Sequence, residues 1–102
     1  MYEIKLHPKF DQWLSGLSDI PTRVRLARRI DRLQQGLVGD VKSLGSGLYE
    51  LREHFGPGWR LYFFYAKDRV VVLLAGGSKS RQGRDIELAK KRRLELEEGE
   101  DG

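Results

Sequence analysis

Hydrophobic and polar residues alternate most clearly over residues 48–65, with the sequence LYELREHFGPGWRLYFFY, and this pattern predicts two β-strands. Two glycines flank Pro57 in the middle of the stretch, which predicts a turn that folds the strands into a hairpin. A three-residue turn at 56–58 places Phe55 opposite Trp59 and keeps the hydrophobic residues of both strands on one side. That side comprises Tyr49, Leu51, Phe55, Trp59, Leu61, Phe63 and Tyr65.

The polar side of the hairpin carries Arg52, His54, Arg60 and Tyr62. The same register pairs His54 with Arg60 and Arg52 with Tyr62, so the two arginines become diagonal neighbours about 7 Å apart at the backbone. Two like charges held this close repel each other unless an anion lies between them. The polar side of the hairpin is therefore the predicted binding surface.

Similar patterns predict the elements before the hairpin. Residues 2–6 alternate as a strand, and a helix begins at Pro8 with hydrophobic residues three and four positions apart. A second helix follows N-cap residues at 18–22 and ends near Gly36. Its hydrophobic stripe is expected to be Val24, Ala27, Ile30, Leu33 and Leu37, and its outward side to hold Arg23, Arg25, Arg28, Arg29 and Arg32.

Residues 39–47 are rich in glycine and are expected to be a connection, whereas residues 70–75 are hydrophobic throughout, as in a central strand. A last helix is expected from about Gln82 or Gly83. The resulting order, β-α-α-β-β-β-α, predicts an α+β domain with a mainly antiparallel sheet, helices packed on one face and the other face open. The polar side of the hairpin would lie on the open face, with Lys79 at its rim.

Charge is distributed unevenly along the chain. All nineteen lysines and arginines precede Leu94, whereas five of the fifteen acidic residues fall in the last eight positions. We therefore expect a single basic domain at residues 1–94, followed by a solvated acidic tail at 95–102. The excess of positive charge in the domain favours a polyanionic partner such as nucleic acid.

The sequence contains no cysteine, and no group of Asp, Glu and His has metal-ligand spacing, so no disulfide, metal or cofactor is expected. The longest hydrophobic run, residues 70–75, is too short to cross a bilayer, and the N-terminal residues lack the hydrophobic segment of a secretion signal. These features predict a cytoplasmic protein with no membrane partner.

Two segments, GDVKSLGSGLYELREHFGPGWRLYFFY and LLAGGSKSRQGRDIELAK, resemble type II toxin–antitoxin toxins of the RelE/ParE superfamily. The most specific pieces are YELR, GPGWRLYF and GGSK, and they are most similar to the HigB-like branch, often labelled addiction module killer proteins. The resemblance implies the RelE-like fold and cleavage of messenger RNA on the ribosome. It also implies neutralisation by a small cognate antitoxin, expected to be a helix-turn-helix protein.

By position, the resemblance implies that Arg52, Arg60 and Lys79 contact the RNA. Metal-free cleavage uses the neighbouring 2′-hydroxyl as nucleophile, and guanidinium groups suit the neutralisation of phosphate charge. We expect Arg60 in this role with Arg52 as support, and His54 and Lys79 as candidates for proton transfer. Tyr62 either stacks on a base or packs in the sheet. The alternative for each of the others is an ordinary strand or loop residue.

Two other function classes fit the same sequence. ParE-like members of the superfamily poison gyrase and do not cleave RNA, so the fold alone does not decide the activity. A non-catalytic nucleic-acid-binding module would use the basic surface for salt-dependent binding without cleavage.

Overall fold

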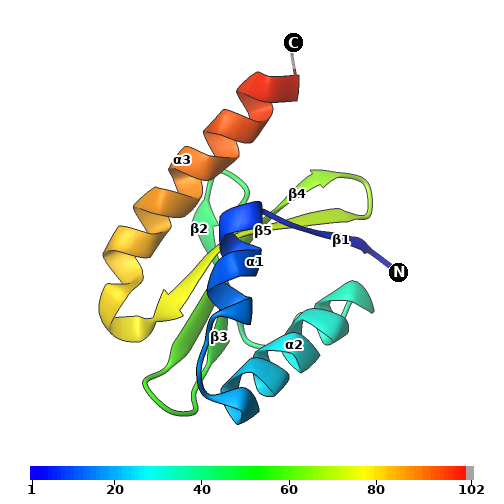
Figure 1. Ribbon diagram of the computed structural model, residues 1–102. Coiled ribbons are helices and arrows are strands. Elements are labelled where there is room, and N and C mark those ends of the chain that lie inside the picture. The colour runs from blue at the N-terminus through cyan, green and yellow to red at the C-terminus, as the bar shows by residue number, and fades with distance from the viewer. Residues whose placement is uncertain (101–102) are drawn as a thin grey trace.

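The computed structural model describes residues 1–100, and the last two residues of the expected acidic tail, Asp101 and Gly102, lie outside the described residues. Its element order is β-α-α-β-β-β-β-α (Figure 1). The strands are β1 (Glu3–Leu6), β2 (Val41–Gly45), β3 (Leu48–Glu53), β4 (Trp59–Lys67) and β5 (Val70–Ser78). The helices are α1 (Pro8–Ser15), α2 (Ile20–Gln34) and α3 (Gln82–Glu100), with a 3-10 turn, η1 (Lys79–Arg81), before α3. The α+β class is confirmed.

The five strands form one sheet in the order β1-β5-β4-β3-β2. β1 runs parallel to β5, and the other neighbours are antiparallel, so the mainly antiparallel sheet is confirmed. The expectation that residues 39–47 form only a connection was wrong, because Val41 pairs with Leu51 and begins an edge strand. Gly45 and Gly47 have positive φ angles of 90° and 78°, which permit the tight turn from β2 into β3.

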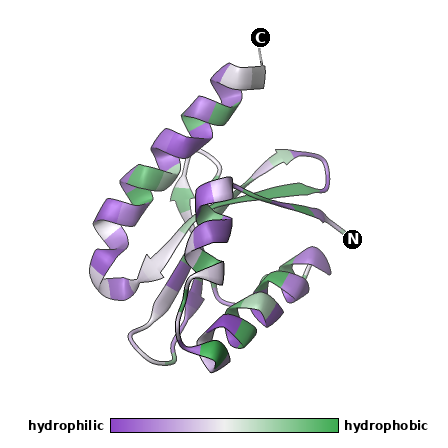
Figure 2. Ribbon diagram, in the orientation of Figure 1, coloured by the Kyte–Doolittle hydropathy of each residue, from purple (hydrophilic) through white to green (hydrophobic). Residues whose placement is uncertain are grey.

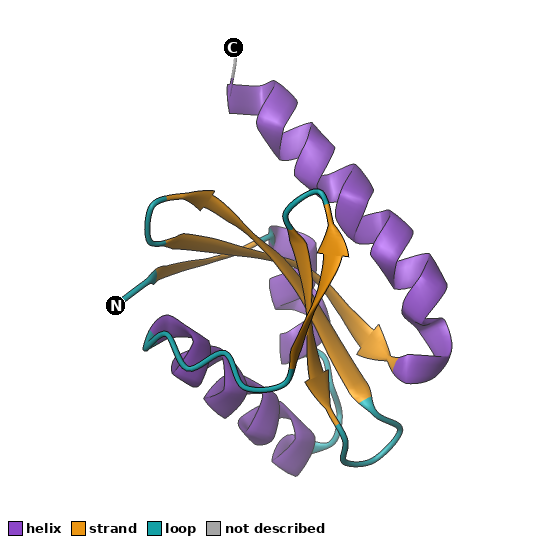
Figure 3. Ribbon diagram, turned by 180° about the vertical axis from the view of Figure 1, so that it is seen from behind, coloured by secondary structure: helices purple, strands orange, loops and turns teal. Residues whose placement is uncertain are grey.

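Helices cover both faces of the sheet, so the expected open face was wrong (Figures 1 and 3). α1 and α2 contribute Phe10 and Leu33 to a core that includes Phe63 of β4. α3 packs on the opposite face, where Ala89 joins a second core with Tyr62 and its neighbours. α3 is hydrophilic along most of its length (Figure 2), and its inward face includes Ile86 and Ala89, the two residues that the sequence pattern places on one side of this helix. It continues without interruption past the beginning of the acidic segment to Glu100.

The hairpin register differs from the prediction by two residues. Glu53 pairs with Trp59, and Arg52 pairs directly with Arg60, because residues 54–58 form a longer turn than expected. The turn is closed by a hydrogen bond from the Gly58 N–H to the Phe55 carbonyl. A shift by two preserves the alternation of faces, so the two sides of each paired strand are as predicted while the partners across the strands are not.

The stripe that α2 buries agrees only in part with the one expected, since Leu33 is in the core and Ile30 packs against it. Its N-cap is Asp19, whose carboxylate accepts from the Thr22 N–H, in agreement with the predicted start. Its buried residues are Thr22, Leu26, Arg29 and Leu33, whereas Val24 and Leu37 are exposed. Arg29 was expected to face outward, but its Nε lies 3.3 Å from Glu53 and its guanidinium donates to the Asp40 carbonyl, so its charge is compensated in the interior.

Candidate nucleic-acid interface

The five predicted site residues do not lie on one uncovered surface. Arg52 is about one-third exposed, and His54 and Lys79 are exposed at the end of the hairpin and after β5. Arg60 and Tyr62, by contrast, are buried beneath the first turns of α3. The structure therefore divides the predicted set into an accessible part and a buried part.

Glu50 links the two parts and was not among the predicted site residues. Its side chain is fully buried, and its Oε2 accepts a 2.6 Å hydrogen bond from Nε2 of Gln82 in α3. Its Oε1 lies 4.0 Å from Nε of both Arg52 and Arg60. The carboxylate thus compensates the repulsion of two arginines that face each other across the hairpin. Alternation along β3 already places Glu50 beside Arg52, and this signal could have identified it.

Arg60 is only 3% exposed, and its Nη1 donates to the carbonyls of Glu53 and Trp59, at 3.2 and 3.0 Å. These hydrogen bonds stabilise the end of the hairpin, where β3 and β4 begin to pair. The expected exposure of Arg60 was wrong, because its guanidinium donates to the main chain and lies beside the buried Glu50.

Tyr62 has no exposed surface, so it does not stack on a base in this conformation. Burial, followed by the neighbouring Glu50 carboxylate, raises the pKa of the Tyr62 hydroxyl above its ordinary value. The packing role weighed for this residue is therefore the one observed.

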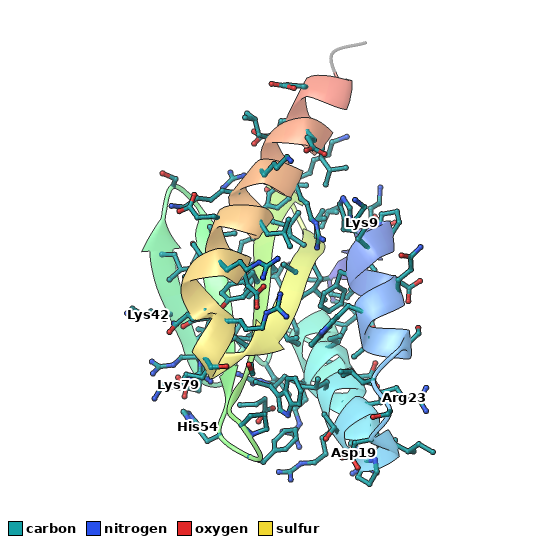
Figure 4. All side chains as sticks on the ribbon, turned by 60° about the vertical axis from the view of Figure 1, so that its left-hand side comes forward. Lys9, Asp19, Arg23, Lys42, His54 and Lys79 are labelled. Atoms are coloured by element: carbon teal, nitrogen blue, oxygen red, sulfur yellow. The ribbon has the colours of Figure 1, made fainter. Side chains whose placement is uncertain are left out.

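Lys79 lies next to the buried cluster, although it is separated from Arg60 in sequence. Its main-chain N–H donates to the Gly58 carbonyl at 2.6 Å, which joins the start of η1 to the hairpin turn. A Cβ atom placed on Gly58 would lie 3.4 Å from Cβ of Lys79 and 3.7 Å from Nη1 of Arg60, so both basic residues flank this glycine. Figure 4 shows Lys79 beside the start of α3, on the same edge as His54 and Lys42.

His54 does not face Arg60. Its Nε2 lies 2.5 Å from Oδ2 of Asp40, just before β2, and its side chain is 65% exposed. This hydrogen bond lowers the pKa of the Asp40 carboxyl below its usual range. The expected pairing of His54 with Arg60 was wrong because the longer turn moves His54 out of the paired strands.

The accessible cations of this edge are Arg52, Lys79 and Lys42, and Lys42 pairs with Glu50 across β2 and β3. Such an arrangement suits contact with successive phosphates of a nucleic-acid backbone. Among the side chains that the structure describes, no three of His, Asp or Glu are grouped to hold a metal ion. No helix in the same range is long and hydrophobic enough to cross a membrane.

Comparison with solved structures finds the same fold in the E. coli toxin RelE, in a double arginine-to-alanine mutant solved in the free state. The TM-score is 0.69 at 18% sequence identity, over 89% of this chain and 96% of RelE. An uncharacterized protein of Haemophilus influenzae (strain ATCC 51907 / DSM 11121 / KW20 / Rd) is 43% identical over 88 residues, which cover 86% of this chain and 89% of that protein. The model of the family described as "Phage derived protein Gp49-like (DUF891)" matches residues 12–94. The chain therefore belongs to the Gp49-like family of phage-derived proteins.

Proposed function

We propose that this protein is the toxin of a toxin–antitoxin pair, acting in the cytoplasm as a HigB-like, metal-independent endoribonuclease that cleaves messenger RNA on the ribosome. Its cognate antitoxin would be a small, helix-turn-helix protein. The RelE-like fold and the Gp49-like family support a toxin. The observation that carries the nuclease proposal is the pair of accessible cations, Arg52 and Lys79, on either side of a buried Arg60–Glu50 cluster.

In the proposed reaction, the 2′-hydroxyl of the RNA gives its proton to His54, which is exposed on the same edge, and its oxygen attacks the adjacent phosphorus and displaces the 5′-oxygen. Arg52 neutralises the charge that develops on the phosphate, because its guanidinium is accessible and stays protonated. Lys79 donates a proton to the leaving 5′-oxygen. Arg60 acts indirectly, by holding the hairpin end and by sharing Glu50 with Arg52. The ribosome supplies the alignment of the substrate that a small, shallow surface does not impose.

Inducible expression in a bacterium tests this proposal, with labelled amino-acid incorporation and mapping of messenger RNA ends as readouts. Arg52→Ala should lower cleavage roughly a hundredfold, as expected for a lost charge-stabilising donor worth about 3 kcal/mol. Lys79→Ala should also reduce cleavage while the protein stays folded. A matched control is Lys67→Ala, which removes an exposed lysine at the other end of β4.

Equal cleavage by Arg52→Ala and wild type would refute the assignment of Arg52. Arrest of replication with intact translation would instead identify a gyrase poison. Rapid cleavage of free RNA by the purified protein would remove the dependence on the ribosome. Arg60→Ala is unsuitable as the main test, because loss of its main-chain hydrogen bonds is expected to destabilise the hairpin itself.

A non-catalytic nucleic-acid-binding module is the second candidate, and the burial of Arg60 and Tyr62 favours it. With those two side chains removed from the surface, the remaining cations suffice for binding phosphates. This candidate predicts salt-dependent RNA binding without new messenger RNA ends, and Arg52→Ala would then reduce affinity alone.

A further inference from the structure

A cavity of about 320 Å³ lies between α1 and α3 at the edge of β5, and the site described above does not use it. β1 pairs with β5 only as far as Leu73, so the last residues of β5 have no strand on this side. α1 and α3 flank the strand there, and Figure 4 shows β5 between them. The cavity is lined by Lys9, Trp13, Leu17, Trp59, Gly76, Gly77, Ser78, Arg81, Asp85, Leu88 and Arg92.

Two glycines form the floor of this cavity and bring its walls close to the strand. A Cβ atom on Gly76 would lie 2.4 Å from the Trp13 ring, and one on Gly77 would clash with Oδ2 of Asp85. An aromatic ring and a carboxylate therefore pack directly on the β5 backbone, from opposite faces. Only glycine at these two positions leaves room for the Trp13 ring and the Asp85 carboxylate to approach the strand this closely.

Two residues of the cavity lining, Asp85 and Trp59, have a buried polar side-chain atom with no hydrogen-bond partner among the residues that the structure describes. The acceptor of the two is Oδ2 of Asp85, a residue that is 4% exposed. Burial raises the pKa of its carboxyl, although Arg81, Arg84 and Arg92 oppose the shift. A buried acceptor without a donor is costly, so such a group in a cavity indicates a ligand that brings N–H donors.

The other lining residues indicate which chemical groups the ligand carries besides its N–H donors. Lys9, Arg81 and Arg92 outnumber the single carboxylate, which favours a ligand that also carries negative charge. Trp13 and Trp59 offer aromatic surfaces to a planar group. A nucleotide combines a phosphate with a planar base, and guanine presents two adjacent N–H donors that a carboxylate can accept together.

We propose that this cavity binds a guanine base, with Asp85 accepting from its N–H edge and the tryptophans contacting its ring. The cavity adjoins the candidate nucleic-acid interface, since Ser78 and Trp59 line it while Lys79 and Arg60 follow them in sequence. A guanine of single-stranded RNA would thus lie one residue along the chain from Lys79, which the proposed reaction places at the leaving 5′-oxygen. That the guanine belongs to RNA rests on the proposed function, whereas binding of the base does not.

Tryptophan fluorescence provides the test, because the two tryptophans of the sequence both line the cavity. The full-length protein is titrated with free 5′-GMP or 5′-AMP, and with 2′-O-methylated RNA pentamers that have G or A at the centre and resist cleavage. We expect the guanine ligand to bind about tenfold more tightly than the adenine ligand. A preference in the pentamers alone identifies RNA as the source of the base, and an equal preference for free GMP identifies a nucleotide ligand.

Asp85→Asn keeps the size of the side chain and should abolish this preference while changing the affinity for the A pentamer less than twofold. The matched control is Glu87→Gln on the outer side of α3, where the side chain is 74% exposed, and it should keep the full preference. Equal binding of G and A by the wild type overturns the inference, as does an undiminished preference in folded Asp85→Asn.

A second measurement needs no substitution. In NMR spectra, the G pentamer should shift the ring resonances of Trp13, and the A pentamer at the same concentration should shift them much less; no shift with either the G pentamer or 5′-GMP refutes the site. These results are independent of messenger RNA cleavage in cells. Guanine binding without cleavage would refute the nuclease proposal and leave the cavity assignment intact. Cleavage without a preference for guanine would refute the cavity assignment and leave the nuclease proposal intact.

Discussion

Glu50 and Asp85 are two buried carboxylates beneath α3, and their surroundings are opposite. Glu50 accepts a hydrogen bond from Gln82 at Oε2, and its Oε1, which makes no hydrogen bond within the described residues, lies 4.0 Å from two arginines. Oδ2 of Asp85 has no hydrogen-bond partner within the described residues and belongs to a residue that lines a cavity. A compensated carboxylate holds elements together, and removing it leaves other charges buried. A buried carboxylate without such partners lowers the free energy of unfolding, so a protein that retains it is expected to use it for function and not for stability. The comparison separates a structural acid from a candidate ligand-binding acid.

The largest effect should follow from removing the compensated acid. Glu50→Ala leaves the buried Arg60 guanidinium without its carboxylate, and we expect the free energy of unfolding to fall by about 3–5 kcal/mol. Urea denaturation measures the loss, with the exposed Glu87→Ala as control. A loss below about 1 kcal/mol would mean that Glu50 does not hold this cluster together.

Gln82→Ala should make Glu50 resemble Asp85. It removes the hydrogen-bond donor of the Glu50 carboxylate, and a bond to a charged group contributes about 2 kcal/mol. Gln12→Ala, at an exposed position on α1, serves as the comparison in the same denaturation experiment. Similar midpoints for the two variants would show that the Gln82 bond is dispensable.

Asp85→Asn should act in the opposite direction and stabilise the protein by about 1 kcal/mol at neutral pH, because the variant no longer buries an unpaired charge. The pKa of Asp85 is raised in the folded protein, so the folded state binds its proton more tightly than the unfolded state. The wild type therefore gains stability relative to the variant as the pH falls from 7 through the folded pKa. Denaturation at a series of pH values should show that the difference in the free energy of unfolding between the wild type and Asp85→Asn narrows as the pH falls. A difference that stays constant with pH would contradict this prediction.

The smallest effect concerns Asp40, an exposed acid that has a partner. Its hydrogen bond with His54 lowers the pKa of Asp40, so the stabilisation is present above the unfolded pKa and is lost as the pH falls through the folded pKa. His54→Ala should raise the Asp40 pKa toward its ordinary value, as followed by NMR titration, with little change in unfolding. An unchanged Asp40 titration would show that the contact is absent in solution.

Local patterns were sufficient to predict much of the fold. Alternation and caps located the hairpin strands, the start of α1 and the start of α3, because these features depend on neighbouring residues. The strand character of residues 41–45 comes from pairing with β3, and the second face of the sheet is covered because α3 packs on β4 and β5. Both depend on residues distant in sequence, which a single-sequence pattern does not record.

The candidate site was harder to predict than the fold. Alternation correctly placed Arg52, Arg60 and Tyr62 on one face, but burial depends on whether a helix covers that face. Asp85 gave no signal in the sequence, since its burial arises from the packing of α3 on the glycine backbone of β5. Charge at a position is visible in a sequence, whereas the availability of that charge is a tertiary property.

The parallel pairing of β1 with β5 has a consequence for synthesis of the chain. Residues 3–6 cannot pair in the sheet until residues 70–73 have been synthesised. The first strand to leave the ribosome therefore stays unpaired until most of the polypeptide has been made. Such distant pairing slows folding, because a long loop must close before its contacts form. β4, β5 and η1, which bring Arg60, Lys79 and the cavity together, are likewise completed late. A translation product that stops before β5 would contain Arg52 but no assembled surface.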